Sequence, residues 1–298
     1  MNAIKLIVLF SMALLSLSAQ AYNVEGMLTY SDKTFKWDGI SNKYETKNTG
    51  LGAVYFFQDV DISKGPWAEA SFLNKSSGVV VMYQDHEYKK TDSDFKYSSE
   101  VAGAAVHSVI ESKWVLEAEL VYLNGKFNDG DRFTANSKSV TIGSYIGERD
   151  QVLFEYAQLD LDYSDDLNID HIVKRFSIKY RYLLGFGNSR YLAVQSSFTK
   201  SNSTDDLDTR GNSFVLGAMY YLRKNLGLRT EVELEREEDD NNDKTRQETY
   251  TLGVEYFPTE SVLLNANYIT ENRLEEPFAS ADRDGEGTRI ELNIGYRF

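Results

Sequence analysis

The chain has 298 residues, a formal net charge of −14 and no cysteine. The lack of cysteine excludes a disulfide framework, a thiol nucleophile and a cysteine metal site. The acidic balance argues against nucleic acid as a partner, because no basic face appears along the sequence.

The first 21 residues have the features of a secretory signal peptide. Lys5 supplies a short positive region, residues 6–17 are apolar, and the Ala-Gln-Ala stretch at 19–21 has the small-x-small form of a cleavage site. A membrane anchor is the alternative, but the apolar run is well short of the ~20 residues that a spanning helix needs. We therefore predict cleavage near Ala21 and a mature chain of residues 22–298.

Amphipathic alternation indicates about fourteen strands in the mature chain. Successive side chains of a strand point to opposite faces, and here apolar residues recur at every second position. Aromatic residues lie near the ends of the apolar rows, as is typical of positions at headgroup level. The predicted strands span residues 24–30, 51–57, 79–88, 95–109, 114–123, 138–146, 151–163, 171–184, 190–199, 213–222, 226–235, 247–257, 262–270 and 287–298.

The segment 65–75 breaks this alternation. Pro66 suits the first turn of a helix, and Trp67, Ala70 and Phe72 do not share a strand face. We predict a short helix or plug at the periplasmic end of the fold; the alternative is a short extra strand, which would make the strand count odd.

Connection lengths favour the helix, because short periplasmic turns and longer external loops then alternate. The short connections are 110–113, 147–150, 185–189, 223–225 and 258–261. The predicted long loops are 31–50, 124–137, 201–212, 236–246 and 271–286.

One predicted strand, 151–163, has an irregular pattern. Val152, Phe154 and Tyr156 share a face with Asp160 and Asp162. A β-bulge near Ala157 would move the two aspartates to the other face.

The last strand ends on an aromatic residue, where soluble chains usually end in polar residues. Ile290, Leu292, Ile294, Tyr296 and Phe298 form its apolar face. It resembles the C-terminal strand of outer-membrane β-barrels, which implies that Tyr296 and Phe298 act as the signal for the barrel-assembly machinery. Together these features predict an all-β fold: a transmembrane antiparallel β-barrel of about fourteen strands in the outer membrane. A soluble β-sandwich is the alternative.

The inward rows of such a barrel carry many charges. An unpaired charge in a dry interior costs several kcal/mol or more, so this lumen must be wet or fully paired. About fourteen strands also make a barrel too wide for side chains to fill. The candidate pore-lining residues are Glu117, Glu119, Arg175, Lys179, Arg181, Arg229, Glu231, Glu233, Glu235, Arg289 and Glu291.

Both signs of charge are present, so we expect weak ion selectivity, with the net charge favouring cations. The alternative for each residue is a structural role, in which the inward charges form ion pairs with one another and make the barrel wall rigid. The acidic runs at 237–240 and 282–286 are typical of solvated surface; binding of divalent cations that bridge lipopolysaccharide is a second interpretation.

Catalysis has little support in the sequence. His86, His107 and His171 lie on separate predicted strands, and Ser108 and Ser177 have no nucleophile motif around them. No metal-ligand spacing, phosphate loop or nucleotide fingerprint occurs. We expect neither enzymatic activity nor a cofactor.

Residues 60–77, VDISKGPWAEASFLNKSS, are similar to a segment of the general porins of Gram-negative bacteria. The resemblance implies an outer-membrane diffusion channel. We therefore expect passive diffusion of small hydrophilic solutes or ions, with membrane lipid, lipopolysaccharide and the assembly machinery as partners. The alternative is a closed barrel with a structural or adhesive role, blocked by residues 65–75 or 31–50.

Overall fold

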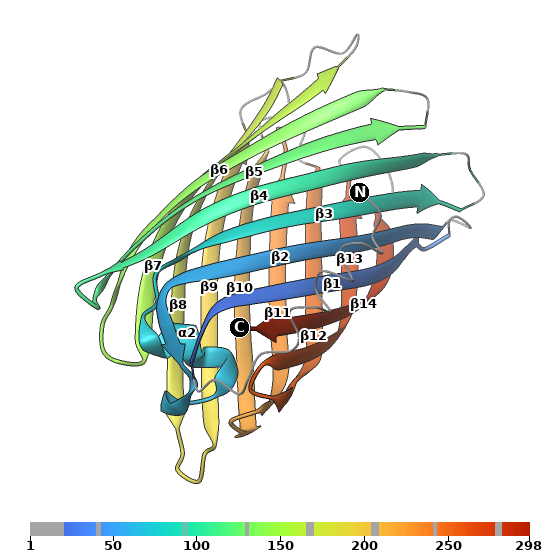
Figure 1. Ribbon diagram of the computed structural model, residues 1–298. Coiled ribbons are helices and arrows are strands. Elements are labelled where there is room, and N and C mark those ends of the chain that lie inside the picture. Colours follow the sequence, from blue (N-terminus) through green and yellow to red (C-terminus); the bar gives the residue numbers. More distant parts are fainter. Residues whose placement is uncertain are drawn as a thin grey trace.

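The computed structural model describes residues 21–39, 43–91, 93, 95–128, 131–164, 170–203, 209–240, 243–277 and 282–298. The predicted signal peptide lies outside them, apart from Ala21. Strands dominate this part of the chain and close into one barrel (Figure 1). They are β1 (Ala21–Trp37), β2 (Lys43–Asp61), β3 (Gly78–Lys90), β4 (Lys96–Ile110), β5 (Trp114–Phe127), β6 (Arg132–Tyr145), β7 (Asp150–Ser164), β8 (Asp170–Gly185), β9 (Tyr191–Ser203), β10 (Arg210–Arg223), β11 (Leu226–Glu238), β12 (Lys244–Thr259), β13 (Val262–Glu276) and β14 (Arg283–Arg297).

Each strand pairs with its neighbours in sequence, and β1 pairs antiparallel with β14 to close the sheet. The predicted transmembrane barrel of fourteen strands is confirmed. Closure removes the free edges that a soluble β-sandwich has to protect. Short turns at 111–113, 146–149, 186–190, 224–225 and 260–261 all lie at one end, which we call the turn end; the opposite end is the loop end.

The strands run further toward the loop end than the apolar rows predict. They contain 13 to 19 residues, whereas a membrane-spanning strand needs about 9–11. The predicted long loops are therefore wrong in extent: residues 31–37 belong to β1 and 43–50 to β2. The loops predicted at 124–137, 201–212, 236–246 and 271–286 are shortened in the same way.

The outer faces of these strand extensions are mostly polar, and their inner faces mix aromatic residues such as Phe35 and Tyr44 with charged ones, so no lipid-facing apolar row marks them in the sequence. Backbone pairing continues nonetheless, and cross-strand charges such as Lys96 and Glu87 join neighbouring strands (2.7 Å). Because residues 31–37 and 43–50 form part of the wall, the idea that they block the lumen is also wrong; residues 40–42 lie outside the described part of the chain.

Outward-facing tyrosines mark the boundary between the apolar and polar parts of the outer face. The hydroxyl of Tyr83 donates to Asp85 (2.9 Å), and that of Tyr250 donates to Glu248 (2.9 Å). In both pairs the carboxylate lies two positions nearer the loop end. This arrangement suits a tyrosine at headgroup level, with its ring in the apolar layer and its hydroxyl in the polar one.

The same boundary explains the irregular alternation of apolar and polar residues in β7. Its register with β6 runs without a shift past Ala157, so the predicted β-bulge is wrong. Tyr156 contacts Gln158 through its hydroxyl (3.5 Å), and Gln158 donates to Asp160 (2.7 Å). The outer face of β7 becomes polar beyond Tyr156 because the strand continues out of the membrane.

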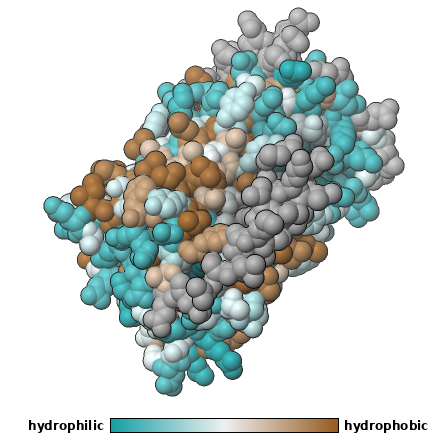
Figure 2. Space-filling model, in the orientation of Figure 1, coloured by the Kyte–Doolittle hydropathy of each residue, from teal (hydrophilic) through white to brown (hydrophobic). Residues whose placement is uncertain are grey.

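Below this boundary the outer wall is apolar. Leu120 and Leu252 are each 62 % exposed, and Ile294 is 56 % exposed. Figure 2 shows hydrophobic residues gathered between hydrophilic ends on the face seen there. Such a surface is stable only in contact with lipid.

One connection at the turn end is not a simple turn. Between β2 and β3 the chain forms η1 (Ile62–Lys64), η2 (Trp67–Glu69) and α2 (Ala70–Asn74). The predicted short helix is confirmed, and an extra strand is excluded for the residues described here. In Figure 1, α2 lies beside the turn end of the barrel. Within the described ranges, no helix has the length and apolar character needed to cross a bilayer.

Candidate functional site: the barrel lumen and its inner segment

We call residues 62–77 the inner segment, because its contacts are with inward-facing side chains of the barrel. Its fold is set by local polar contacts. Asp61 accepts from the backbone N–H of Ser63 (2.8 Å) and so begins η1. The amide of Asn74 donates to the carbonyls of Asp61 and Ala70 (2.7 Å each), which ties the end of α2 back to the end of β2.

Glu69 is the central anchor of the inner segment. Its side chain is 4 % exposed, accepts a hydrogen bond from Tyr221 of β10 (2.8 Å) and forms an ion pair with Arg181 of β8. The Arg181 guanidinium also lies 4.6 Å from the centre of the Phe72 ring. A buried carboxylate is stable only when paired, so these wall residues fix the position of the segment.

Arg297 of β14 provides a second anchor. Its side chain is 5 % exposed, donates to the carbonyl of Trp67 (3.0 Å) and pairs with Glu25 of β1 (2.9 Å). The Trp67 backbone N–H donates in turn to the carbonyl of Lys224 in the turn after β10 (2.9 Å). The segment is thus bonded to widely separated strands of the wall.

Two apolar clusters seal the inner segment against the wall. The first surrounds Phe72 with inward residues of β5, β6, β8, β9 and β10: Val115, Tyr145, Leu183, Ala193 and Tyr221. The second joins Ile62 and Ala70 to Tyr22, Phe56 and Val60 of β1 and β2. The segment therefore narrows the turn end of the barrel.

A cavity of about 180 Å³ remains beside Glu69, bounded by Arg181, Arg229 and Glu255. A water molecule needs about 10–15 Å³ of such space, so the cavity is large enough for several waters. It lies on the side of the inner segment that faces β9 to β12. Any route past the segment on this side is narrow and lined by charge.

Ion pairs continue along the wall nearer the loop end. Lys179 lies 2.6 Å from Glu155, and Arg229 lies 2.9 Å from Glu231. On the same inner wall, His107 Nδ1 lies within hydrogen-bond distance of Glu117 (3.1 Å). Pairing lowers the cost of facing charge inward without removing the charge from solvent.

These inward-facing charged side chains are exposed to solvent. The side chains of Lys179, Arg181 and Arg229 are 43 %, 37 % and 32 % exposed although they face the inside of the barrel. A cavity of about 280 Å³ opens beside Lys179 and Arg181. A packed interior would bury such groups, so the lumen on this side of the inner segment holds water.

The remaining candidate residues also lie at inward positions, in smaller groups. Glu119 accepts from Ser139 (3.5 Å), and Glu233 accepts from Ser213 (3.3 Å). Glu291 accepts from Asn267 and Asn293 (3.1 Å each). Arg175, Glu235 and Arg289 complete the set, and the Nε of Arg289 is buried without a hydrogen-bond partner among the described residues.

Sequence reasoning missed several residues that organise the lumen. Glu155 is one of them: it forms a close pair with the predicted residue Lys179. The alternation of β7 would have placed Glu155 inward if Asp160 had not obscured the faces of that strand. Glu69 carries no signal in the sequence, because its partners are more than a hundred residues away.

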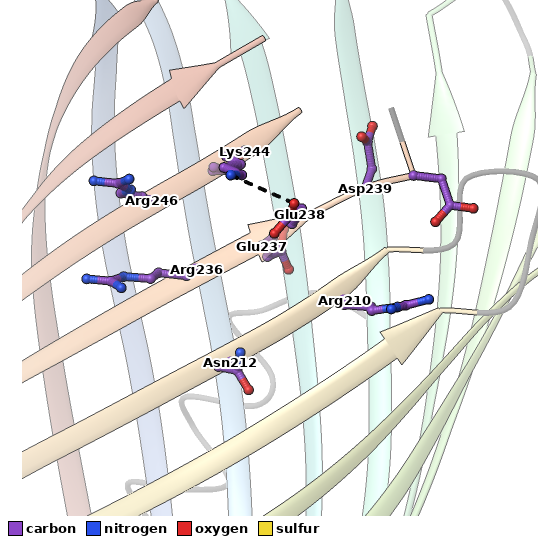
Figure 3. A pocket seen from close by; sticks show the side chains of 10 residues that line it. Arg210, Asn212, Arg236, Glu237, Glu238, Asp239, Lys244 and Arg246 are labelled. Atoms are coloured by element: carbon purple, nitrogen blue, oxygen red, sulfur yellow. Dashed lines mark ion pairs between the residues drawn. The ribbon is translucent and has the colours of Figure 1, made fainter. Parts of the chain in front are cut away.

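A separate groove of about 490 Å³ lies on the outer face near the loop end (Figure 3). Arg210, Arg236 and Arg246 line it from neighbouring strands at outward positions, and Lys244 lies 3.8 Å from Glu238 across β11 and β12. This groove is not part of the lumen. Within the described ranges, no group of three or more His, Asp or Glu side chains could hold a metal ion.

The closed barrel, its lipid-exposed outer belt and its wet, charged inside define an outer-membrane β-barrel protein. The family profile described as "Putative general bacterial porin" matches residues 3–277. This chain belongs to that family of porins. No curated protein matches it.

Solved structures of outer-membrane proteins are similar to this chain at low sequence identity. Omp33 of Acinetobacter baumannii is 16 % identical, with 94 % of this chain and 100 % of that chain covered and a TM-score of 0.54. OmpT of Vibrio cholerae is 12 % identical, with coverages of 93 % and 99 % and a TM-score of 0.48. An anion-selective porin of Comamonas acidovorans is 10 % identical, with coverages of 92 % and 98 % and a TM-score of 0.45.

Proposed function

We propose that this protein is a passive outer-membrane channel for small hydrophilic solutes or ions, with no cofactor and no catalysed reaction. The wet inward charges carry the proposal: Lys179 and Arg181 face the lumen and are 43 % and 37 % exposed. Water-filled barrels with charged walls conduct ions, and the sign of the wall charge biases which ions pass. The inner segment sets the narrowest part of the path.

A closed barrel with a structural or adhesive role is the second candidate. The two apolar clusters around Phe72 and Ile62 favour it, because they seal the inner segment to much of the wall. In this case solutes would enter the lumen from the loop end and go no further.

Single-channel recording separates the two. The mature chain, refolded in detergent and inserted into a planar bilayer, is expected to give discrete ohmic steps and a measurable reversal potential in a salt gradient. Absence of current from a barrel that still shows heat-modifiable migration would contradict the channel and support the closed barrel.

The acidic row of β11 is expected to make the channel prefer cations. Changing Glu231, Glu233 and Glu235 together to Gln removes three lumen carboxylates and should lower the cation preference at least about twofold, measured as the reversal potential in a salt gradient. The control changes three outward glutamates, Glu238, Glu248 and Glu276, to Gln. An unaltered reversal potential in the first variant would remove the row from the pore-lining residues.

The C-terminal strand is proposed to direct assembly through Tyr296 and Phe298, whose rings lie 4.7 Å apart. Phe298→Ala should reduce the amount of folded barrel in the outer membrane of cells and leave refolding in detergent unchanged, since the backbone of Phe298 still pairs with Val24 (2.9 Å). Ile294→Ala, in the same outward row, is the control. Equal losses in cells and in detergent would mean a purely structural role.

A further inference from the structure

Aromatic side chains form a continuous inward arc at the loop end of the lumen. The arc begins at Trp37 and Phe35 of β1, whose ring centres lie 5.1 Å apart. It passes to Tyr44 of β2 (6.5 Å from Phe35) and Tyr88 of β3 (5.9 Å from Tyr44). It ends with Tyr97, Phe127 and Phe133 of β4, β5 and β6, at successive separations of 4.8, 5.9 and 5.3 Å.

Strand register places these rings inside the barrel. Phe35 is opposite Tyr44, Tyr88 is opposite Tyr97, and Tyr97 is opposite Phe127, so they share one face of the sheet. The lipid-facing residues of the same strands have the other parity: Tyr55 and Phe57 on β2 are 52 % and 57 % exposed. The arc is therefore distinct from the aromatic residues at the membrane boundary.

The first part of the arc borders a cavity of about 350 Å³. Phe35, Trp37, Tyr44 and Tyr88 form its aromatic side, and polar groups come from Lys33, Glu271 and Arg273. Lys33 is already paired with Glu271 (2.5 Å) and Arg273 with Glu275 (3.2 Å), so the cavity carries little uncompensated charge. The Nε of Arg273 is a buried donor that has no hydrogen-bond partner among the described residues.

Flat aromatic faces beside a few fixed polar groups suit a ring-shaped, neutral, hydroxyl-rich ligand. A pyranose has one apolar face of C–H groups, which stacks on an aromatic ring, and a rim of hydroxyls that accept and donate hydrogen bonds. A single sugar fits the cavity chemistry, and the rings that follow along the wall repeat the same surface for the next sugar units.

We propose that the arc is a binding track for neutral oligosaccharides at the mouth of the lumen. Sugars that stack on Trp37, Tyr44 and Tyr88 are concentrated at the entrance and aligned along the wall before they reach the inner segment. Their passage through the barrel rests on the channel function proposed above; their binding to the arc does not.

Two readouts test the track. Maltohexaose, a linear glucan, added to the full-length mature protein in a planar bilayer should reduce the salt current in a saturable way, and polyethylene glycol of similar mass should not. Binding is read independently by fluorescence of Trp37 in detergent, in a background with Trp67→Phe and Trp114→Phe, where maltohexaose should shift the emission with the same concentration dependence.

The variant Trp37→Leu, Tyr44→Leu, Tyr88→Leu keeps apolar bulk on the wall but removes the flat faces. It should raise the half-blocking concentration of maltohexaose at least about tenfold and leave the conductance in salt alone unchanged. Tyr55→Leu with Phe57→Leu, on the lipid side, is the matched control for loss of two aromatic residues.

The outcomes separate the track from the channel. If the barrel carries no current but Trp37 still reports saturable sugar binding, the track stands and the channel fails. If the barrel conducts and neither readout responds to maltohexaose, or if the Leu variant responds like the unaltered protein, the track is overturned and the arc serves only to pack the strand ends.

Discussion

Deletion of residues 65–75 is expected to increase the single-channel conductance severalfold. The deletion removes Trp67, Glu69 and Phe72, and with them the contacts that Phe72 and Ala70 make in the two apolar clusters at the turn end. The five residues left between Asp61 and Gly78 can span roughly 17 Å. Because Phe57 donates its backbone N–H to the carbonyl of Ser77 (2.9 Å), the two strands are already adjacent and such a link suffices.

The measurement is the step size in a planar bilayer in the same salt on both sides, with heat-modifiable migration as the check on folding. The wall should survive the deletion, since its strands are held by ladders that do not involve the inner segment. A folded deletion variant with unchanged step size would mean that residues 65–75 do not limit the current.

Glu69→Gln should free the inner segment without removing it. The substitution replaces the buried carboxylate that binds Tyr221 and Arg181. Hydrogen bonds to charged groups contribute roughly 1.5–3 kcal/mol each. A loss of about 3 kcal/mol from the docked state multiplies the undocked population about a hundredfold. In single-channel records we expect new, larger conductance levels or frequent transitions between levels.

Two control variants test whether the transitions between conductance levels depend on the contacts of Glu69. Tyr221→Phe removes only one of the hydrogen bonds to Glu69 and should give fewer transitions. Glu155→Gln removes a lumen carboxylate that is paired just as closely, with Lys179 (2.6 Å), but is not bonded to the inner segment. Equal transition rates in Glu69→Gln and Glu155→Gln would show that the anchor at Glu69 does not hold the segment in place.

The barrel could be predicted from the sequence because the alternation of apolar and polar residues that indicates it lies within each single strand. Leu116, Ala118 and Leu120 alternate with Glu117 and Glu119 within one strand, and the parity of the short connections favours an even strand count. The ends of the strands could not be placed, because apolar rows stop where the membrane stops and backbone pairing does not. For the same reason the sequence around Asp160 predicts a bulge that β7 does not contain.

The charged lumen could be predicted only in part. Alternation places Lys179 and Arg181 inward, but it does not say which partner each one meets. Arg181 meets Glu69, 112 positions away in sequence, and Tyr221 meets the same carboxylate from 152 positions away. Such contacts depend on how the strands curve into a barrel and on where the inner segment docks.

In the channel proposed above, the loop end faces outside the cell, and the strand extensions form its rim. Antibodies, phages and neighbouring cells would then meet a rim of paired strands. An insertion of one residue within this rim would reverse the faces of every residue beyond it. Antigenic change is therefore expected to proceed by substitution on the rim and by insertion only at its tips.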